Sequence, residues 1–434
     1  MSLTAHQEEK LVESLEILKN SKRLLITGSA GVGKTYLVNE LIGRLAKTLP
    51  FMRKIYCSAP TNKAVAVLKG KVDERPNLEF TTVHSALKIK REVNFRTGAI
   101  TFKPFYSEKY PPLKGVGLLI IDEGSMLNTE LLRYVEEHAD NNNCIVIFIG
   151  DHKQLNPVGE DVSPIFVQGY PEVEITEIVR QGEGNPIIPL SRNLDAIFNK
   201  IDNRIDDNGY LYSDNLPQVI ETLAAVNGTD ELKYLAWTNK EVDMINNLVR
   251  KRIYGPSPNK VEVGETLVFN NPYKEEYFTN QEIKVESLQV LEKKFYYPAG
   301  KVPGAFTSTT TFKPITFKYY SINSKFDEEL GQQIDNVVLI HEDSDAAFNK
   351  LLANLRSMCK AKIIPWTDYY SFKESFADLK YNHAITVHKS QGSTYGQTIV
   401  NIQNLKLNKN KTERERLLYT AITRASKLLI LYKV

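Results

Sequence analysis

Short apolar runs alternate with amphipathic segments along the first third of the chain. Four apolar runs predict buried strands at Arg23–Thr27, Lys54–Ser58, Val116–Ile121 and Ile145–Ile149. Apolar residues at helical spacing predict a first helix that begins at Thr4 and a second that follows the Gly-rich turn after Arg23–Thr27 and runs to about Ala46. Two further helices are predicted over Asn62–Leu68 and Glu130–His138. In the first helix we expect one apolar face made of Leu11, Val12, Leu15 and Leu18. This alternation is typical of a mainly parallel sheet with helices on both faces.

The same pattern returns in the second half, with strands predicted at Tyr234–Trp237, Ala384–Val387, Thr398–Ile402 and Leu428–Tyr432. Two segments, one in each half of the chain, interrupt this alternation of strands and helices. Phe95–Phe102 predicts a hairpin that turns at 96–99, and Pro272–Tyr320, rich in Thr, Lys and aromatic residues, predicts a small antiparallel β domain, such as a barrel. A strand at Val337–Ile340 and a helix over Ser344–Met358 follow. We therefore expect two α/β domains, each with a small insertion.

Composition excludes several classes of protein. A chain of 434 residues that is 42% hydrophobic and 25% charged is globular, and its length suggests two to four domains. Apolar runs are too short to cross a membrane, and Met1–Lys10 has no apolar core typical of a secretory signal. The cysteines Cys57, Cys144 and Cys359 lie far apart and form no Cys-x-x-Cys pair, which favours a reducing, cytoplasmic location without disulfides or zinc.

Charge is concentrated in one segment. The whole chain is only +3, but 85–112 carries six basic residues against two acidic ones, together with five aromatic rings. Cations for phosphates and flat rings for bases are what a single-stranded nucleic-acid surface needs. A solvated hairpin with its own small apolar face explains the same residues. The segment alone does not decide between these two interpretations.

Gly28–Thr35 matches the G-x-x-x-x-G-K-[ST] pattern between a predicted strand and a predicted helix, as the motif requires. Glycines let successive backbone N–H groups point at phosphate oxygens, and the helix N-terminus adds positive potential. Lys34 can reach the β and γ phosphates, and the Thr35 hydroxyl can bind Mg²⁺. The sequence therefore predicts a site for a nucleoside triphosphate, with ATP and Mg²⁺ as cofactors.

Further polar residues follow the other predicted strands of this sheet. Asp122 can hold the Mg²⁺ shell and Glu123 can activate the attacking water, although Asp122 could instead cap the following helix. Gln154, in Gly150–Val158, can contact the γ-phosphate or that water. Phosphoryl transfer also needs cations, and Arg180 and Arg424 are candidates, although composition does not distinguish them from surface arginines.

Taken in order, these motifs resemble those of superfamily 1 DNA helicases. The segments that carry the resemblance, besides the phosphate-binding loop, are Ala59–Ala64, Thr82–Ser85, Ile121–Met126, Gly150–Val158, Glu177–Gln181, Trp237–Lys240, Thr386–Gly392 and Tyr419–Ala425. The His-Lys-Ser-Gln-Gly and Val-His-Ser versions are similar to the 1B branch, which holds the RecD, Pif1 and Dda types, and the chain is most similar to the Dda type. The resemblance extends from Leu3 to Leu431.

The resemblance implies roles for matching residues at the nucleotide. Arg180 and Arg424 would be arginine fingers, one from each motor domain, and Gln7 would contact the adenine edge. Gln7 has a competing explanation, because Thr4-x-x-Gln7 is also a helix capping box. The residues expected to bind the nucleotide are Gln7, Gly28, Ser29, Ala30, Gly31, Val32, Gly33, Lys34, Thr35 and Gly392.

The resemblance also implies a track for single-stranded DNA, lined by Pro60, Thr61, Asn62, His84, Thr238, Asn239, Thr386, His388 and Lys389. Small hydroxyls and backbone amides there can grip phosphates without reading sequence. His84 and His388 could each be core histidines instead. The hairpin lies where this branch carries its strand-separating pin, and Phe95 is our first choice for the ring that stacks at the fork.

These implications give two RecA-like motor domains, over 1–84 with 113–185 and over 186–265 with 376–434. The expected insertions are a pin domain at 85–112 and an SH3-like β barrel at 266–375. The implied activity is that of a monomeric ATP-dependent DNA helicase that moves 5′-to-3′ and unwinds forked duplex in replication, recombination or repair. Partners would be single-stranded DNA and its binding or replication proteins, in a bacterial or phage-infected cytoplasm. A RecD-like subunit of a nuclease complex and an ATPase that binds DNA without unwinding remain alternatives.

Overall fold

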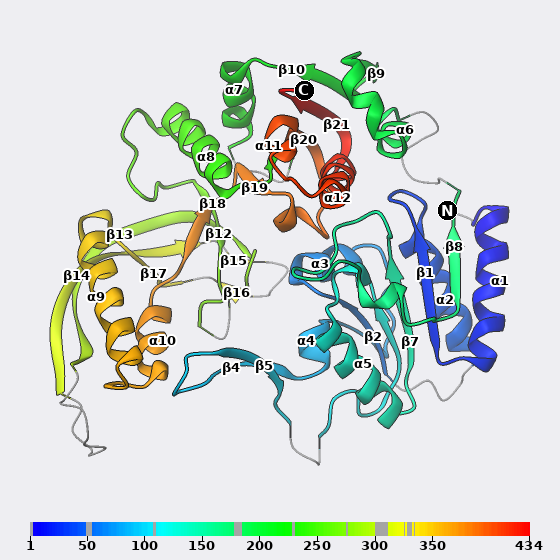
Figure 1. Cartoon of the computed structure of the whole chain (residues 1–434), viewed down its shortest axis with the longest axis horizontal. Helices are drawn as coiled ribbons and strands as arrows, with labels where there is room; N and C mark the ends of the chain where they lie inside the picture. Colours follow the sequence, from blue (N-terminus) through cyan, green and yellow to red (C-terminus); the bar gives the residue numbers. More distant parts are fainter. Residues whose placement is uncertain are drawn as a thin grey trace.

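Two α/β domains and two insertions make up the molecule (Figure 1). The computed structural model describes residues 3–48, 54–106, 110–177, 185–227, 231–274, 277–299, 311–324, 326–327, 332–333 and 335–434. We name the first α/β domain 1A, its inserted hairpin 1B, the second α/β domain 2A, and its β-rich insertion 2B. The predicted α/β fold class is confirmed.

Domain 1A is a sheet of six parallel strands in the order β3-β2-β6-β7-β1-β8. The strands are β1 (Arg23–Gly28), β2 (Lys54–Ala59), β3 (Leu78–Thr82), β6 (Val116–Ile121), β7 (Ile145–Gly150) and β8 (Glu172–Ile175). One face packs on α1 (Ala5–Asn20), α2 (Lys34–Thr48) and α3 (Asn62–Lys69), and the other on α4 (Val83–Ala86) and α5 (Thr129–Asn141). The expected apolar face of α1 was wrong in one residue. Val12 is 47% exposed, because one helical step of about 100° turns it away from the buried Leu11.

The 1B insertion is the predicted hairpin, formed by β4 (Ile89–Val93) and β5 (Ile100–Pro104). Its turn is closed by Asn94, whose side-chain oxygen accepts hydrogen bonds from the N–H groups of Arg96 and Thr97 at 3.0 Å each. Figure 1 shows the hairpin reaching from 1A toward α10 (Trp366–Glu374) of 2B.

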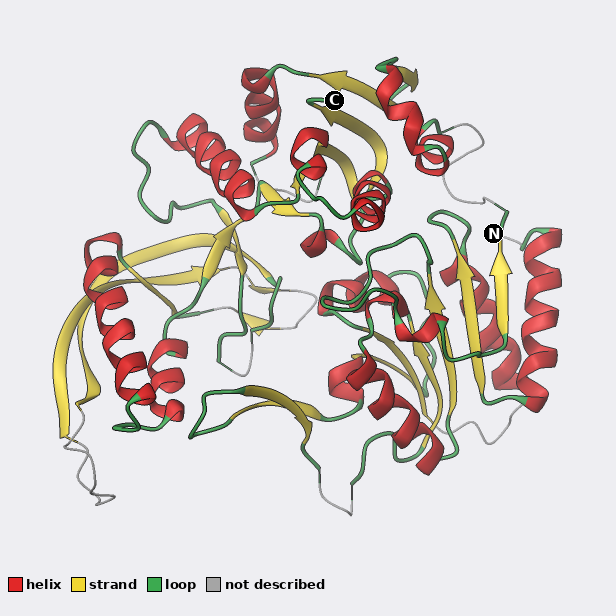
Figure 2. Cartoon of the chain, viewed as in Figure 1, coloured by secondary structure: helices red, strands yellow, loops and turns green. Residues whose placement is uncertain are grey.

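Domain 2A has a second sheet, in the order β19-β11-β20-β21-β10-β9, parallel except at the β9 edge (Figure 2). Its strands are β9 (Asn203–Ile205), β10 (Asn208–Ser213), β11 (Leu232–Ala236), β19 (Ala384–Thr386), β20 (Tyr395–Asn401) and β21 (Ala425–Tyr432). Its helices are α6 (Ile187–Arg192), α7 (Leu216–Val226), α8 (Asn239–Tyr254), α11 (Ile402–Lys406) and α12 (Lys411–Ile422). The strand predicted to reach Ile402 ends one residue earlier, because Asn401 caps α11.

The 2B insertion is an antiparallel sheet in the order β17-β14-β13-β12-β18, which confirms its predicted β-rich character. Its strands are β12 (Thr266–Phe269), β13 (Glu282–Ala299), β14 (Thr311–Ser324), β17 (Val337–Ile340) and β18 (Leu379–Tyr381), with a separate pair β15 (Phe326–Asp327) and β16 (Gln332–Gln333). Helices α9 (Glu342–Lys360) and α10 pack on the hairpin formed by β13 and β14. All three cysteines are buried and unpaired, and no helix among the described residues could span a membrane.

Candidate nucleotide and nucleic-acid sites

Three neighbouring strands of 1A end in the predicted nucleotide-binding segments. The phosphate-binding loop follows β1, Asp122 follows β6, and Asp151 follows β7, which lies between them in the sheet. Because the carboxyl ends of parallel strands meet at one edge, these groups converge where open α/β sheets bind ligands. The fold therefore brings the main predicted nucleotide residues of 1A together.

The phosphate-binding loop needs its glycines. Gly31 and Gly33 have φ values of +87° and +80°, which side chains rarely tolerate. A Cβ on Gly28 would lie 2.6 Å from the Ile175 carbonyl oxygen. Lys34 Nζ donates hydrogen bonds to the carbonyl oxygens of Gly28 (2.6 Å) and Ser29 (3.0 Å), so its ammonium group lies within its own loop.

The acidic pair occupies a strained turn at the end of β6. Glu123 has a φ of +51°, and its N–H donates to Oδ1 of Asp122 at 2.8 Å. The alternative role of Asp122 as the cap of α5 was wrong, because the Asn128 side chain caps that helix and accepts from the Leu131 N–H at 2.8 Å. The Asp122 carboxylate is therefore not used as the cap of α5.

Burial raises the pKa of the Glu123 carboxyl above that of an ordinary glutamate. Arg424 lowers this pKa, Asp122 raises it, Lys34 lowers it and Asp151 raises it, in decreasing order of effect. A 2A arginine therefore acts on the same carboxyl as the phosphate-loop lysine of 1A. Arg424 itself is buried and donates to the carbonyl oxygens of Thr420 (3.1 Å) and Ser393 (3.0 Å). Arg180 lies outside the described residues.

Gln154 is placed to receive a ligand. It is 4% exposed, yet its side-chain oxygen has no hydrogen-bond partner within the described part of the chain. Burying an unpaired amide is costly, so an incoming donor there is favourable. Within the described ranges, no group of three or more His, Cys, Asp or Glu side chains could hold a metal ion by itself.

Tyr419 of α12 is a site residue whose role the sequence did not reveal. Its hydroxyl accepts a hydrogen bond from the Ala30 N–H of the phosphate-binding loop at 2.9 Å and donates one to Oδ2 of Asp151 at 2.6 Å. The only signal was its position inside the quoted segment Tyr419–Ala425. This contact joins 2A directly to the phosphate-binding loop.

Gln7 takes part in the capping box that competed with adenine contact. Thr4 and Gln7 exchange backbone-to-side-chain hydrogen bonds at 3.2 Å, and the Gln7 side-chain N–H donates to the Val32 carbonyl at 3.2 Å. An open hollow of about 470 Å³ lies between α1 and α2, lined in part by Thr4, Tyr36 and Arg44. The capping box is thus present, and adenine contact stays a prediction.

The expected DNA-track residues of 1A follow β2 and β3. Pro60 and Thr61 connect it to α3, where the Thr61 hydroxyl accepts from the Ala64 N–H at 3.2 Å. Asn62 is the first residue of α3. His84, in α4, is half-buried against the Phe102 ring of 1B at 5.7 Å, and burial lowers the pKa of its imidazole.

The expected track residues of 2A lie at the start of α8 and at or just beyond the end of β19. Thr238 caps α8, whose first residue is Asn239, and Thr386 ends β19. His388 is half-buried and lies 4.0 Å from a carboxylate oxygen of Glu413. Gly392 lies close to 1A, because a Cβ there would be 2.9 Å from that of Ala64 and 3.7 Å from the Thr61 hydroxyl. Its predicted contact with nucleotide stays a prediction.

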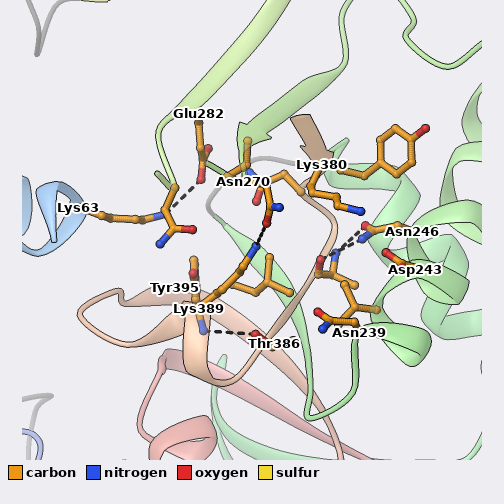
Figure 3. A pocket seen from close by; sticks show the side chains of 17 residues that line it. Lys63, Asn239, Asp243, Asn246, Asn270, Glu282, Lys380, Thr386, Lys389 and Tyr395 are labelled. Carbon is orange, nitrogen blue, oxygen red and sulfur yellow. Dashed lines mark hydrogen bonds and ion pairs between the residues drawn. The ribbon is translucent and has the colours of Figure 1, made fainter. Parts of the chain in front are cut away.

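A pocket of about 390 Å³ lies beside the expected track residues of 2A (Figure 3). Its lining comes from 1A, 2A and 2B and includes Lys63, Asn239, Asn270, Glu282, Thr386 and Lys389. Lys389 Nζ donates to Oδ1 of Asn270 at 2.6 Å, and Lys63 Nζ forms an ion pair with Glu282 at 3.1 Å. Burial lowers the pKa of the Lys389 ammonium. Lys63 lies within the motif segment Ala59–Ala64, whereas nothing in the sequence pointed to its partner Glu282 or to Asn270.

The tip of 1B rests on 2B. The backbone N–H of Trp366 donates to the Phe95 carbonyl at 2.9 Å, and Arg91 forms an ion pair with Glu374 at 2.6 Å. Gly98 lies against the Trp366 indole, where a Cβ would come within 2.3 Å. The Phe95 side chain is 51% exposed. The predicted pin is therefore braced at its backbone while this ring remains accessible.

Together, the two sheets and the phosphate-binding loop define a P-loop protein with two RecA-like domains. A family model described as an AAA domain matches residues 12–160, and one described as a UvrD-like helicase C-terminal domain matches residues 381–432.

Among relatives, the ATP-dependent DNA helicase dda of Enterobacteria phage T4 is 26% identical over 92% of both chains. The uncharacterized protein R530 of Acanthamoeba polyphaga mimivirus is 26% identical over 97% of both. The structure of Bacteroides Pif1 bound to ssDNA matches with a TM-score of 0.51 and 18% identity, over 99% of this chain and 92% of that chain. The resemblance to the 1B branch of superfamily 1 helicases is confirmed.

Proposed function

We propose that this chain is an ATP-dependent DNA helicase that moves 5′-to-3′ on single-stranded DNA and unwinds duplex. The observation that carries the proposal is that the Tyr419 hydroxyl of 2A bonds to the phosphate-binding loop of 1A, while Arg424 of 2A lowers the pKa of Glu123 in 1A. A nucleotide between these groups would contact both domains, so its binding and loss can change their spacing. The name of the T4 relative supports the activity, and the family resemblance supports the direction.

The residues at the 1A edge suit ATP. The loop amides and Lys34 would bind phosphates, and the unpaired Gln154 oxygen would accept a hydrogen bond from the attacking water. Mg²⁺ commonly takes one or two protein ligands beside phosphate and water, so the Thr35 hydroxyl and the Asp122 carboxylate suffice. When bound, Mg²⁺ neutralises phosphate charge.

Glu123 would orient that water and accept its proton, because a carboxyl with a raised pKa holds a proton better than an ordinary one. Arg424, and Arg180 as the family implies, would stabilise charge on the γ-phosphate oxygens. Gln7 would contact adenine, with Gly392 at the domain junction. These groups act together only when 1A and 2A are close.

The DNA track would pass the Thr61 and Thr238 helix caps and the pocket in Figure 3. Its other proposed contacts are Pro60, Asn62, His84, Asn239, Thr386, His388 and Lys389. If 1A and 2A grip the strand alternately as their spacing changes, each cycle gives one step toward the pin with Phe95. The motor domains would cover 1–84 with 113–185 and 186–265 with 376–434, except that β18, within the last range, pairs with β12 in the 2B sheet.

The test uses two duplexes, one with a 5′ single-stranded tail and one with a 3′ tail. ATP-dependent strand separation of the 5′-tailed duplex alone is the expected result. Hydrolysis stimulated by single-stranded DNA without strand separation would overturn helicase activity and leave a DNA-dependent ATPase. Preference for the 3′ tail would overturn the direction. Lys34→Ala should abolish both hydrolysis and strand separation, which controls for contaminating ATPase.

A further inference from the structure

The Tyr419 hydroxyl connects the two motor domains at the phosphate-binding loop. Tyr419 belongs to α12 of 2A, but its hydroxyl bonds to Ala30 and Asp151, both in 1A. The residue is 2% exposed, so both hydrogen bonds are shielded from water. A buried hydroxyl that loses its partners is costly, which makes these bonds matter to the relative position of the domains.

The phenol oxygen occupies a position suited to a phosphate oxygen. Backbone N–H groups of a phosphate-binding loop point at the anion, and the Ala30 N–H is bonded to Tyr419 instead. Lys34 is similarly engaged, by the carbonyl oxygens of Gly28 and Ser29. Protein groups thus satisfy the loop in this structure, and a triphosphate that uses the Ala30 N–H must displace the hydroxyl.

The same turn of chain carries Arg424. The Tyr419 carbonyl accepts hydrogen bonds from the Thr423 N–H (3.0 Å) and the Thr423 hydroxyl (2.9 Å). Arg424 Nε in turn donates to the Thr420 carbonyl at 3.1 Å. A bond that holds Tyr419 against the loop therefore also fixes the end of α12 from which Arg424 extends.

We propose that Tyr419 is a positioning residue that responds to whether the phosphate-binding loop is filled. In this structure its hydroxyl holds the Ala30 N–H and fixes the end of α12. A triphosphate takes that N–H, the hydroxyl keeps only its bond to Asp151, and the turn that carries Arg424 is released to readjust around the phosphate. The proposal rests on the proposed nucleotide function and adds to it a competitor built into 2A.

Tyr419→Phe tests this competition, because it removes the hydroxyl and keeps the ring. The variant loses the Ala30 bond only in the empty protein, whereas the Asp151 bond is lost with and without nucleotide. One neutral hydrogen bond corresponds to about 3- to 10-fold in affinity, so the variant should bind a non-hydrolysable ATP analogue about 3- to 10-fold more tightly. Damage to the site would act in the opposite direction.

Tyr234→Phe is the matched control within 2A. The Tyr234 hydroxyl is also buried, donates to Glu241 Oε1 at 2.9 Å and accepts from Asn401 Nδ2 at 2.8 Å, and both of these partners lie in 2A. The wild type and both variants are titrated as full chains with a fluorescent ATP analogue, without DNA. Thermal melting first sets a temperature at which all three are folded.

Tighter binding by Tyr419→Phe, with Tyr234→Phe equal to the wild type, supports the proposal. Equal or weaker binding by Tyr419→Phe overturns it, as does the same gain in Tyr234→Phe. A wild-type protein that binds no ATP analogue would instead refute the proposed nucleotide function. The failure of the proposal and the failure of the function are therefore distinguishable.

Discussion

Glu123 is a single side chain whose titration depends on groups from both α/β domains. As the proposed base, its carboxyl must be ionised to accept a proton from water, and burial raises its pKa above the ordinary value of 4.5. Activity that needs the carboxylate is present above that pKa and is lost as the pH falls through it. We therefore expect the kcat of DNA-stimulated ATP hydrolysis to fall on the acid side at a higher pH than an ordinary glutamate would give.

The pH profile of kcat checks this expectation. Because Arg424 lowers the Glu123 pKa, Arg424→Gln should move the acid side of the profile to higher pH, in addition to slowing hydrolysis. Glu123→Gln should still bind ATP but turn it over very slowly, so it controls for loss of binding. An acid side at or below pH 4.5 in the wild type would contradict the assignment of Glu123 as the base.

Arg250 and Glu265 form the buried ion pair that joins α8 of 2A to the chain leading into 2B. They are 3% and 0% exposed, and the two hydrogen bonds between them measure 2.5 and 3.1 Å. Arg250→Ala leaves the Glu265 carboxylate buried with only the Glu262 N–H as a donor and without its cationic partner, so it should lower the free energy of unfolding by about 3–5 kcal/mol.

Urea unfolding measures this loss, with Arg252→Ala as the control. Arg252 lies on the same helix and pairs with Glu221, but both side chains are 56% exposed and water screens the pair. The control should therefore change stability little. Equal losses in the two variants would show that burial is not what makes the Arg250 pair matter.

At the scale of elements, the proposed pin can be tested separately from the proposed ATPase. The β4–β5 hairpin is held to 2B by backbone and charged groups, which leaves the Phe95 ring exposed. Phe95→Ala should therefore spare ATP hydrolysis stimulated by single-stranded DNA and reduce strand separation several-fold, since stacking of one base on a ring contributes about 1–3 kcal/mol.

Parallel assays of hydrolysis and strand separation test the pin. Phe105→Ala is the matched control, because Phe105 is also exposed but lies at the base of the hairpin, beyond the end of β5. It should affect both activities little. A parallel loss of hydrolysis and strand separation in Phe95→Ala would argue against a role confined to the fork.

The sequence predicted elements better than it predicted the contacts between them. Apolar runs located the strands of both α/β domains, because a strand covered on both faces needs continuous apolar residues. Errors came at boundaries and phases, as at Val12 and Ile402. The bonds of Tyr419 to Ala30 and of Lys63 to Glu282 join residues 389 and 219 positions apart, and no local pattern encodes such pairings.

For the molecule as a whole, 2B covers the track that the motor domains would share. Its Glu282 pairs with Lys63 of 1A, and its Asn270 accepts from Lys389 of 2A (Figure 3). A carboxylate and an amide oxygen thus stand where phosphate oxygens would be expected. If DNA binds these lysines, its phosphates must displace both 2B side chains, so 2B opposes binding until a strand is present.

Glu282→Gln tests this arrangement. The substitution keeps the shape of the side chain and removes its charge, so the Lys63 pair is weakened and repulsion of DNA phosphates is lost. The pair is partly exposed, with side-chain exposures of 24% and 27%, and a contribution of about 1 kcal/mol corresponds to roughly 5-fold tighter binding of single-stranded DNA without nucleotide. Fluorescence anisotropy with a labelled oligonucleotide measures this ratio.

Salt and position distinguish the cause of any gain in DNA affinity. The advantage of Glu282→Gln should shrink as salt rises from about 0.05 to 0.3 M, because salt screens partly exposed charges. Asp243→Asn makes the same charge change on another wall of the same pocket, where the carboxylate does not pair with Lys63, and should give a smaller gain. Equal gains in DNA affinity in the two variants would show that the effect depends only on net charge. Weaker binding by Glu282→Gln would show that the ion pair supports the track instead of opposing DNA.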